Sequence, residues 1–255
     1  MTQQTTSPEH IEYLLRIGDN ALILGQRMSE WCGHAPVLEE DMALANTALD
    51  FIGQARMVLT HAGKLEGQGR DEDQLAFLRT EGKYRNVTLC ELPNVDFGHT
   101  MLRNFFFSRF QLLLWERLLK SSDEELAGIA AKSIKEARYH VQHAADWVLR
   151  LGDGTEESHA RMQAALDYQW PYTAEFFAAS PADDVVAAAG VGPAWSELEA
   201  AWEAAVVPVL NEATLTVPAR TPFRTYGKFG RHSEHMGHLL SEMQYLQRTY
   251  PGANW

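Results

Sequence analysis

The sequence contains few of the features that mark secreted, membrane-spanning or disulfide-stapled proteins. Only two of its 255 residues are cysteine, Cys32 and Cys90, and their wide separation forms no redox or metal-binding motif. We therefore expect reduced thiols in a cytoplasmic protein. The polar N-terminus, MTQQTTSPEH, lacks the basic and apolar regions of a signal peptide. No run of about 18 apolar residues occurs, so neither a membrane span nor a membrane partner is expected.

Positive charge is scarce as well. Lys and Arg together number 22 against 34 Asp and Glu, which gives a formal net charge of −12. A surface with this balance repels phosphate backbones, so nucleic acid is not expected as a partner. The hydrophobic fraction of 45% is ordinary for a globular protein, and a chain of this length can bury a substantial core.

Helical patterns fill almost the whole chain, and no segment alternates as a strand would. Ser7, Pro8 and Glu9 are typical of a helix start. Ser122 and Glu125 predict a capping box at the start of the fifth helix. The predicted helices span about 8–32, 37–66, 71–80, 95–120, 122–152, 155–179, 194–213 and 233–249.

Four of these helices have about 25 residues or more, which is typical of a long-helix bundle. No linker rich in Pro, Gly or Ser divides them. We expect one all-α domain over residues 1–255, with flexible residues 1–8, a kink at Pro171 and shorter helices after the bundle. The aromatic run Phe105–Phe107, with Phe110 and Trp115, covers more than one helix face, so it predicts core packing together with a contact to another subunit.

Three long helices place an acid on a mainly apolar face: Asp19, Asp50 and Glu136. Buried carboxylates are costly unless they are paired, hydrogen-bonded or bound to metal. A ferritin-like di-iron bundle would explain them, because it draws carboxylates from four helices and Glu-x-x-His pairs from two of them. Surface positions on imperfectly phased helices are the simpler alternative.

The di-iron template fails at several positions. Asp50 and Glu136 could supply acids, but Gly53 and Tyr139 occupy the histidine positions three residues later. The helix predicted over 95–120 offers Ser108 and Gln111 where a third carboxylate is needed. Iron that activates oxygen requires several oxygen and nitrogen ligands, so the residues predict neither a catalytic nor a metal site in this chain, and no cofactor.

Several histidines keep more than one interpretation. His140 and His143 follow Glu136 as packing or hydrogen-bonding residues, or as ligands of an unusual site. His232, His235 and His238 could bridge a metal, but they also suit a polar helix start or a subunit contact.

The bundle centre is where we expect Asp50 and Glu136 to lie close together. Two nearby carboxylates repel, so at least one of them must share a proton or accept hydrogen bonds from other groups. Tyr139, His140 and Arg56 are the candidate donors.

Five segments, from about residue 15 to the C-terminus, resemble the PaaC-type structural subunits of phenylacetyl-CoA epoxidases, the bacterial multicomponent phenylacetyl-CoA monooxygenases. They are LRIGDNALILGQRMSEWCGHAP, ALANTALDFIGQARMVL, AAKSIKEARYHVQHAADWVLRLGDGT, WEAAVVPVLNEATLTVP and HSEHMGHLLSEMQYLQRTYPG. Together they cover nearly the whole chain and are far more specific than any single motif above.

The resemblance implies a ferritin-like bundle that pairs with a homologous catalytic subunit, which holds the di-iron centre. It also implies further small subunits and a reductase with flavin and iron–sulfur centres, which takes electrons from NADPH. In that family this subunit is regarded as non-catalytic in aerobic phenylacetate degradation. A homodimer of the isolated chain is a further expectation. The alternative is a metal-dependent oxygenase with an atypical site around Asp50 and Glu136, with His140 and Asp19; a ferritin-like storage protein is a third.

Overall fold

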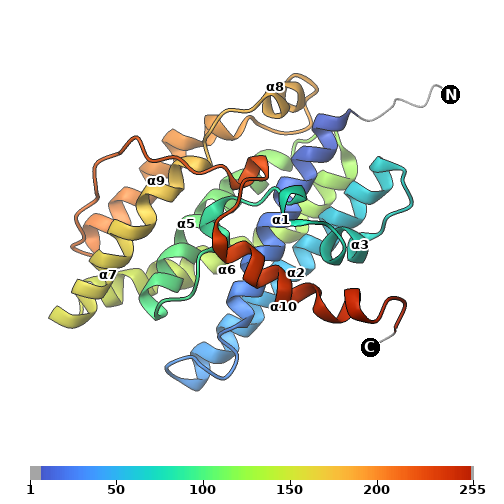
Figure 1. Ribbon diagram of the computed structural model, residues 1–255. Coiled ribbons are helices and arrows are strands. Elements are labelled where there is room, and N and C mark those ends of the chain that lie inside the picture. The colour runs from blue at the N-terminus through green and yellow to red at the C-terminus, as the bar shows by residue number, and fades with distance from the viewer. Residues whose placement is uncertain (1–6, 254–255) are drawn as a thin grey trace.

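The computed structural model describes residues 7–253, and their regular structure is helical apart from an isolated antiparallel bridge between Tyr226 and Arg231 (Figure 1). The α-helices of this part of the chain are α1 (Pro8–Ser29), α2 (Leu38–Glu66), α3 (Glu72–Phe77), α4 (Thr88–Glu91), α5 (Phe97–Leu118), α6 (Glu124–Gly152), α7 (Glu156–Gln169), α8 (Pro181–Ala188), α9 (Glu199–Glu212) and α10 (Glu234–Thr249). Short 3₁₀ turns lie at Glu81–Lys83, Trp170–Glu175, Trp195–Leu198 and Gly227–Phe229.

Four long helices form the bundle. α1 packs along α2, α5 packs along α6, and α2 also contacts α6. The later helices cover this bundle: α7 and α9 lie against α5 and α6, α8 lies against α1, and α10 contacts α3 and α4 (Figure 1). The prediction of an all-α, ferritin-like long-helix bundle with shorter helices after it is confirmed. No helix within residues 7–253 combines the length and the apolar character needed to cross a bilayer.

The start of α1 follows its sequence signal. The hydroxyl of Ser7 accepts a hydrogen bond from the backbone N–H of His10 at 3.2 Å, and Pro8 takes the first helical position. Ser7 and Pro8, which the prediction counted as flexible, therefore form the start of α1, and residues 1–6 lie outside the described residues.

The start of α6 differs from the prediction. Asp123, and not Ser122, caps this helix, because its carboxylate accepts from the backbone N–H of Leu126 at 3.1 Å. The hydroxyl of Ser122 instead donates to the carbonyl of Ala189 at 3.0 Å. The capping-box prediction with Glu125 was wrong because a distant segment takes the hydroxyl.

The helix predicted over 155–179 is interrupted as Pro171 suggested, but it ends rather than kinks. α7 stops at Gln169 and a 3₁₀ turn follows, since proline cannot donate the next helical hydrogen bond. The sequence analysis missed α8, an eight-residue helix that begins after the capping hydroxyl of Ser180.

The aromatic residues of α5 are used inside the protomer. Every member of the run is at most 1% exposed: Phe105, Phe106, Phe107, Phe110 and Trp115. The ring of Phe110 stacks on Phe176 with centroids 4.6 Å apart, and Phe106 packs against Trp202 at 5.6 Å. The helices after the bundle cover this face, so the expected contribution of these aromatics to a subunit contact was wrong.

Asp19 is fully buried, on the inward face that its spacing indicated. Its carboxylate forms an ion pair with Arg79, whose Nη1 lies 2.9 Å from Oδ2, and accepts from the backbone N–H of Arg85 at 2.8 Å. Burial lowers the pKa of Arg79, but the charge and hydrogen bond of Asp19, together with Tyr84 and Glu66, outweigh that effect and raise it. The acid therefore fastens the segment that follows α3 to the middle of α1.

Replacing Asp19 by Ala should lower the free energy of unfolding by about 3–5 kcal/mol, because Arg79 would remain buried without its counterion. Chemical denaturation measures the loss. The matched control is Arg161→Ala, which breaks the exposed Arg161–Glu157 pair on α7 and should cost under about 1 kcal/mol. Equal losses for the two variants would contradict the structural role of the buried pair.

Candidate functional site

A chain of amide hydrogen bonds crosses the bundle centre. Gln54 on α2 donates from Nε2 to Oε2 of Glu136 on α6 at 2.8 Å. Gln111 on α5 donates from Nε2 to Oε1 of Gln54, also at 2.8 Å. Both glutamine side chains are almost completely buried, whereas Glu136 is half-buried. Three of the four bundle helices are therefore joined at their centre by amides and one carboxylate.

A second polar pair lies between α2 and α6. Nε2 of His140 is 3.0 Å from Oδ2 of Asp50, and the imidazole is completely buried against the ring of Phe51. Asp50 keeps 34% of its side chain exposed. Each of the two acids thus has its own protein partner: His140 for Asp50 and Gln54 for Glu136.

The two acids still affect each other. Burial raises the pKa of Glu136, the hydrogen bond from Gln54 opposes this shift, and the nearby charge of Asp50 raises the pKa further. Asp50 and Glu136 are therefore close enough to interact, although each carboxylate also reaches the rim of the bundle.

Gly53 and Tyr139, the positions where the template requires histidines, face outward. Tyr139 is 49% exposed and stacks on His143, and a Cβ atom at Gly53 would meet no other atom within 4 Å. Their assignment to the bundle centre was wrong because the acids lie at the edge of the inward face. Gln54 follows Gly53 and His140 follows Tyr139, and each lies about 100° further around its helix. These two side chains point inward instead.

Two of the three proposed donors were also wrong. Tyr139 points to solvent, and Arg56 is 75% exposed and pairs with Glu72 at 3.2 Å. His140 is the one candidate that contacts an acid of the centre. The sequence analysis missed Gln54, although it lies four residues after Asp50 on the same helix face.

On α5, Ser108 and Gln111 are buried as their spacing suggested. The hydroxyl of Ser108 donates to Oδ1 of Asn104 at 3.1 Å. This helix contributes amide and hydroxyl groups to the centre, where a di-iron bundle needs a carboxylate.

These residues do not fit a di-iron centre. Iron favours imidazole and carboxylate ligands, but the fully buried groups at the centre are glutamine amides, an asparagine, a serine and the single imidazole of His140. In the part of the chain that the structure describes, His10, His61 and Asp123 are the His, Cys, Asp or Glu side chains that converge closely enough to hold a metal. Asp50, Glu136 and His140 do not form such a group.

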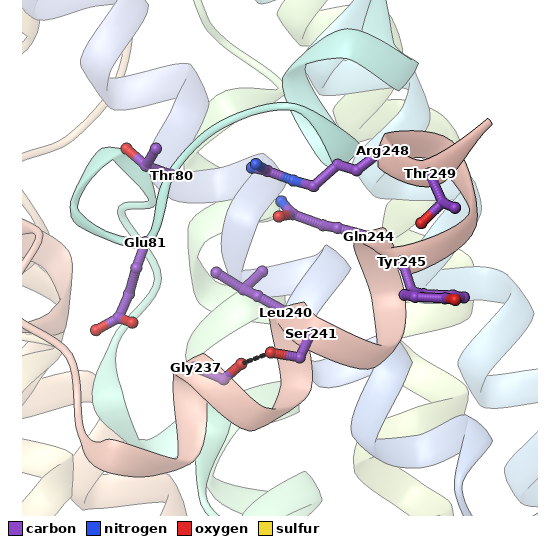
Figure 2. A pocket seen from close by; sticks show the side chains of 9 residues that line it. All are labelled: Thr80, Glu81, Gly237, Leu240, Ser241, Gln244, Tyr245, Arg248 and Thr249. Carbon is purple, nitrogen blue, oxygen red and sulfur yellow. Dashed lines mark hydrogen bonds between the residues drawn. The ribbon is translucent and has the colours of Figure 1, made fainter. Parts of the chain in front are cut away.

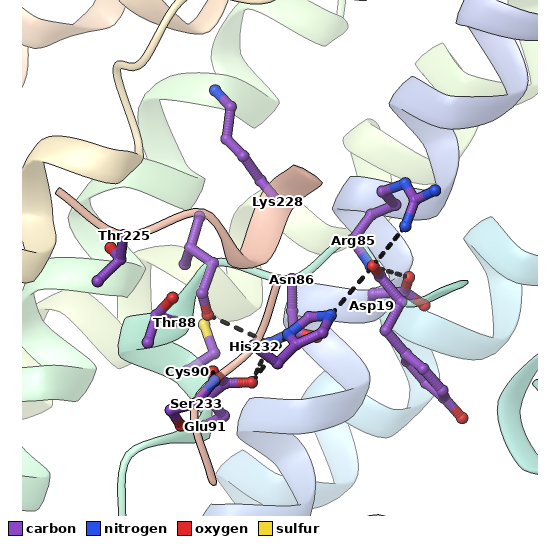
Figure 3. A network of polar contacts seen from close by, with 12 residues as sticks. Asp19, Arg85, Asn86, Thr88, Cys90, Glu91, Thr225, Lys228, His232 and Ser233 are labelled. Atoms are coloured by element: carbon purple, nitrogen blue, oxygen red, sulfur yellow. Dashed lines mark hydrogen bonds and ion pairs between the residues drawn. The ribbon is translucent and has the colours of Figure 1, made fainter. Parts of the chain in front are cut away.

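His232, the first histidine of the C-terminal trio, takes part in a buried ion pair. Its Nδ1 lies 3.0 Å from Oε2 of Glu91 and its Nε2 lies 3.2 Å from the carbonyl of Tyr84 (Figure 3). Burial lowers the pKa of His232, but the hydrogen bond and charge of Glu91 outweigh it and raise the pKa. His235 and His238 are partly or fully exposed on α10 and do not join His232.

A neighbouring buried glutamate fastens the same segment. Glu175 accepts from the backbone N–H of Thr88 at 2.9 Å, from that of Lys228 at 2.7 Å and from the hydroxyl of Thr225 at 2.6 Å. Figure 3 shows Thr88, Thr225, Lys228 and His232 around the turn before α10. Sequence reasoning missed Glu91 and Glu175, because both belong to short or irregular elements without a readable period.

A surface hollow of about 530 Å³ runs along α10 (Figure 2). It is lined by Thr80, Glu81, Gly237, Leu240, Ser241, Gln244, Tyr245, Arg248 and Thr249. None of the polar residues of the bundle centre reaches it, so it offers no access to Glu136 or Asp50.

The whole chain, residues 1–255, matches the model of a family described as phenylacetic acid catabolic protein. The chain belongs to this family. A curated relative from Escherichia coli (strain K12), named as one of the subunits of 1,2-phenylacetyl-CoA epoxidase, is 50% identical over 243 residues. That alignment covers 95% of this chain and 98% of the relative. The resemblance drawn from the sequence segments is therefore confirmed.

The free energy of unfolding of the Glu136→Gln variant, compared with that of the wild type at the same pH, should increase as pH rises. The pKa of Glu136 is raised in the folded state. The stability that protonated Glu136 contributes is therefore fully present below the unfolded-state pKa of about 4.3. It is lost as pH rises through the folded-state pKa. Gln keeps an oxygen that can accept from Gln54 but cannot ionise.

Denaturant titrations between about pH 4 and pH 7 measure this trend. The control is Glu242→Gln, at an exposed position of α10. A difference between wild type and Glu136→Gln that is constant with pH, or that has the opposite slope, would contradict the burial of this carboxyl.

Proposed function

We propose that this chain is a non-catalytic, structural subunit of a phenylacetyl-CoA epoxidase, which pairs with a homologous di-iron catalytic subunit and stabilises it. The observation that carries the proposal is the chain from Glu136 through Gln54 to Gln111. Where a catalytic bundle would need ligands, this chain has amides that hydrogen-bond one another. The 50% identity to a protein named as a subunit of that enzyme supports membership of such a complex.

The alternative of an atypical oxygenase has less support. It would need Asp50, Glu136 and His140 to release their present partners and converge on a metal. Asp19 cannot join them without leaving Arg79 buried and unpaired. The site that would have to form therefore competes with interactions that stabilise the fold.

A stripe on α2 is the surface that we assign to the catalytic subunit. Leu38, Met42 and Leu49 are 73%, 60% and 65% exposed, and their spacing places them within about 40° of one another around the helix. The apolar faces of α1 and α5 are buried within the protomer, so α2 is the long bundle helix that leaves large aliphatic side chains in solvent. Such a stripe suits a helix-face contact with a bundle of the same kind.

The wider assembly belongs to the same proposal. The catalytic subunit would supply the di-iron centre, and a reductase with flavin and iron–sulfur centres would deliver electrons from NADPH. This chain would hold none of these groups and would act in the cytoplasm. In isolation, the α2 stripe would pair two copies of the chain, and the catalytic subunit would replace one of them.

Reconstitution tests the division of roles. We expect no turnover of phenylacetyl-CoA from this chain with reductase, NADPH and oxygen, and epoxide formation once the catalytic subunit is added. The catalytic subunit with reductase but without this chain gives the reference rate. Turnover in the absence of the catalytic subunit would contradict the proposal.

The contact surface can be tested separately. Leu49→Glu should weaken binding to the catalytic subunit by about 30-fold or more, since a charge would be buried at a contact worth about 2 kcal/mol. Isothermal titration calorimetry measures the affinity, and circular dichroism should show an unchanged helix content because Leu49 is exposed in the protomer. The matched control is Leu246→Glu on α10, which is 44% exposed. Equal effects of the two variants would place the contact elsewhere.

A further inference from the structure

Two histidines and one aspartate meet at one end of the bundle, away from the centre described above. His10 comes from the first turn of α1, His61 from the last turns of α2, and Asp123 is the cap of α6. The ligand-type atoms of the three side chains all lie within 4.8 Å of one another. Three helices that are separate in sequence therefore present imidazole and carboxylate groups to one point.

Both imidazoles approach the same oxygen of the carboxylate. Nε2 of His61 lies 2.6 Å from Oδ2 of Asp123, and Nε2 of His10 lies 2.9 Å from the same oxygen. The Nε2 of His10 is buried, but its direction does not satisfy a hydrogen bond to any acceptor. The other oxygen, Oδ1, is already held by the backbone N–H of Leu126.

The site is enclosed but reachable. The side chains of His61 and Asp123 are each 9% exposed, and that of His10 is 15% exposed.

We propose that His10, His61 and Asp123 bind a divalent cation of the zinc type and that this cation fastens the starts of α1 and α6 to the end of α2. Two imidazole nitrogens and one carboxylate oxygen are ligands that Zn²⁺ accepts at about 2.0–2.2 Å, with water in the remaining position. Small rotations of the side chains would place the three ligand atoms at that distance from one shared ion. The cation cross-links helices and takes no part in phenylacetyl-CoA chemistry.

The test uses the full-length chain without any partner, stripped of metal and then titrated with Zn²⁺. We expect one equivalent to bind, and we expect Zn²⁺ to raise the unfolding temperature until a chelator is added. Co²⁺ in place of Zn²⁺ should give visible absorption bands from the bound ion.

Variants assign the site. Asp123→Asn and His61→Gln should each weaken Zn²⁺ binding by roughly 100-fold or more, since even groups that only orient a ligand are worth about 10- to 100-fold. Asn is as good a helix cap as Asp, so Asp123→Asn should keep the fold, which circular dichroism checks. The control is His235→Gln on α10, which should bind like the wild type.

Two results would overturn the proposal. One is a wild-type chain that takes up less than one equivalent of Zn²⁺ at micromolar concentration, which would leave a His–Asp–His cluster without a metal role. The other is unchanged affinity in both Asp123→Asn and His61→Gln, which would place the cation at another site.

Discussion

The amide and carboxylate groups buried between the long helices need hydrogen-bond partners, and this requirement determines how the bundle centre is arranged. An unpaired buried amide or carboxylate costs more than most packing contacts return. A catalytic bundle can meet the requirement with metal ions. Here Gln111 donates a hydrogen bond to Gln54, and Gln54 donates one to Glu136. His140 is the hydrogen-bond partner of Asp50. The same positions that could have held a site hold the helices together.

The requirement also explains the position of the C-terminal segment. Glu91, Glu175 and Asp183 are buried acids, and they are satisfied by residues far away in sequence. Asp183 pairs with Arg16 at 3.0 Å, and the charged group of Lys228 lies 3.9 Å from it. Burial lowers the pKa of Lys228 to about 8. The chain after α9 therefore returns across the bundle and is fixed there by charge, which leaves the stripe on α2 uncovered.

The sequence predicted the helices well where their signals are local. The cap at Ser7, the end of α2 near Gly67 and the interruption at Pro171 need only their neighbours in the chain. The cap of α6 and the existence of α8 could not be obtained in this way, because Ser122 bonds to Ala189 and α8 packs on α1. Gly53 and Tyr139 led to the expectation that a di-iron site is absent, but both face outward, and the amides of the bundle centre were not predicted. The sequence placed Tyr139 and Gly53 at the centre, whereas the neighbouring residues His140 and Gln54 lie there. Consecutive residues of a helix differ by about 100° in direction, which is the size of this error.

The central claim is that amide groups close the bundle centre to iron, and an anaerobic titration with Fe²⁺ tests it most directly. The protein to use is the full-length Asp123→Asn variant, in which metal binding at His10 and His61 is weakened. The account predicts no tight binding and no change when Glu136 is also replaced by Gln. Two equivalents of iron, bound tightly and lost in the variant that also carries Glu136→Gln, would contradict it.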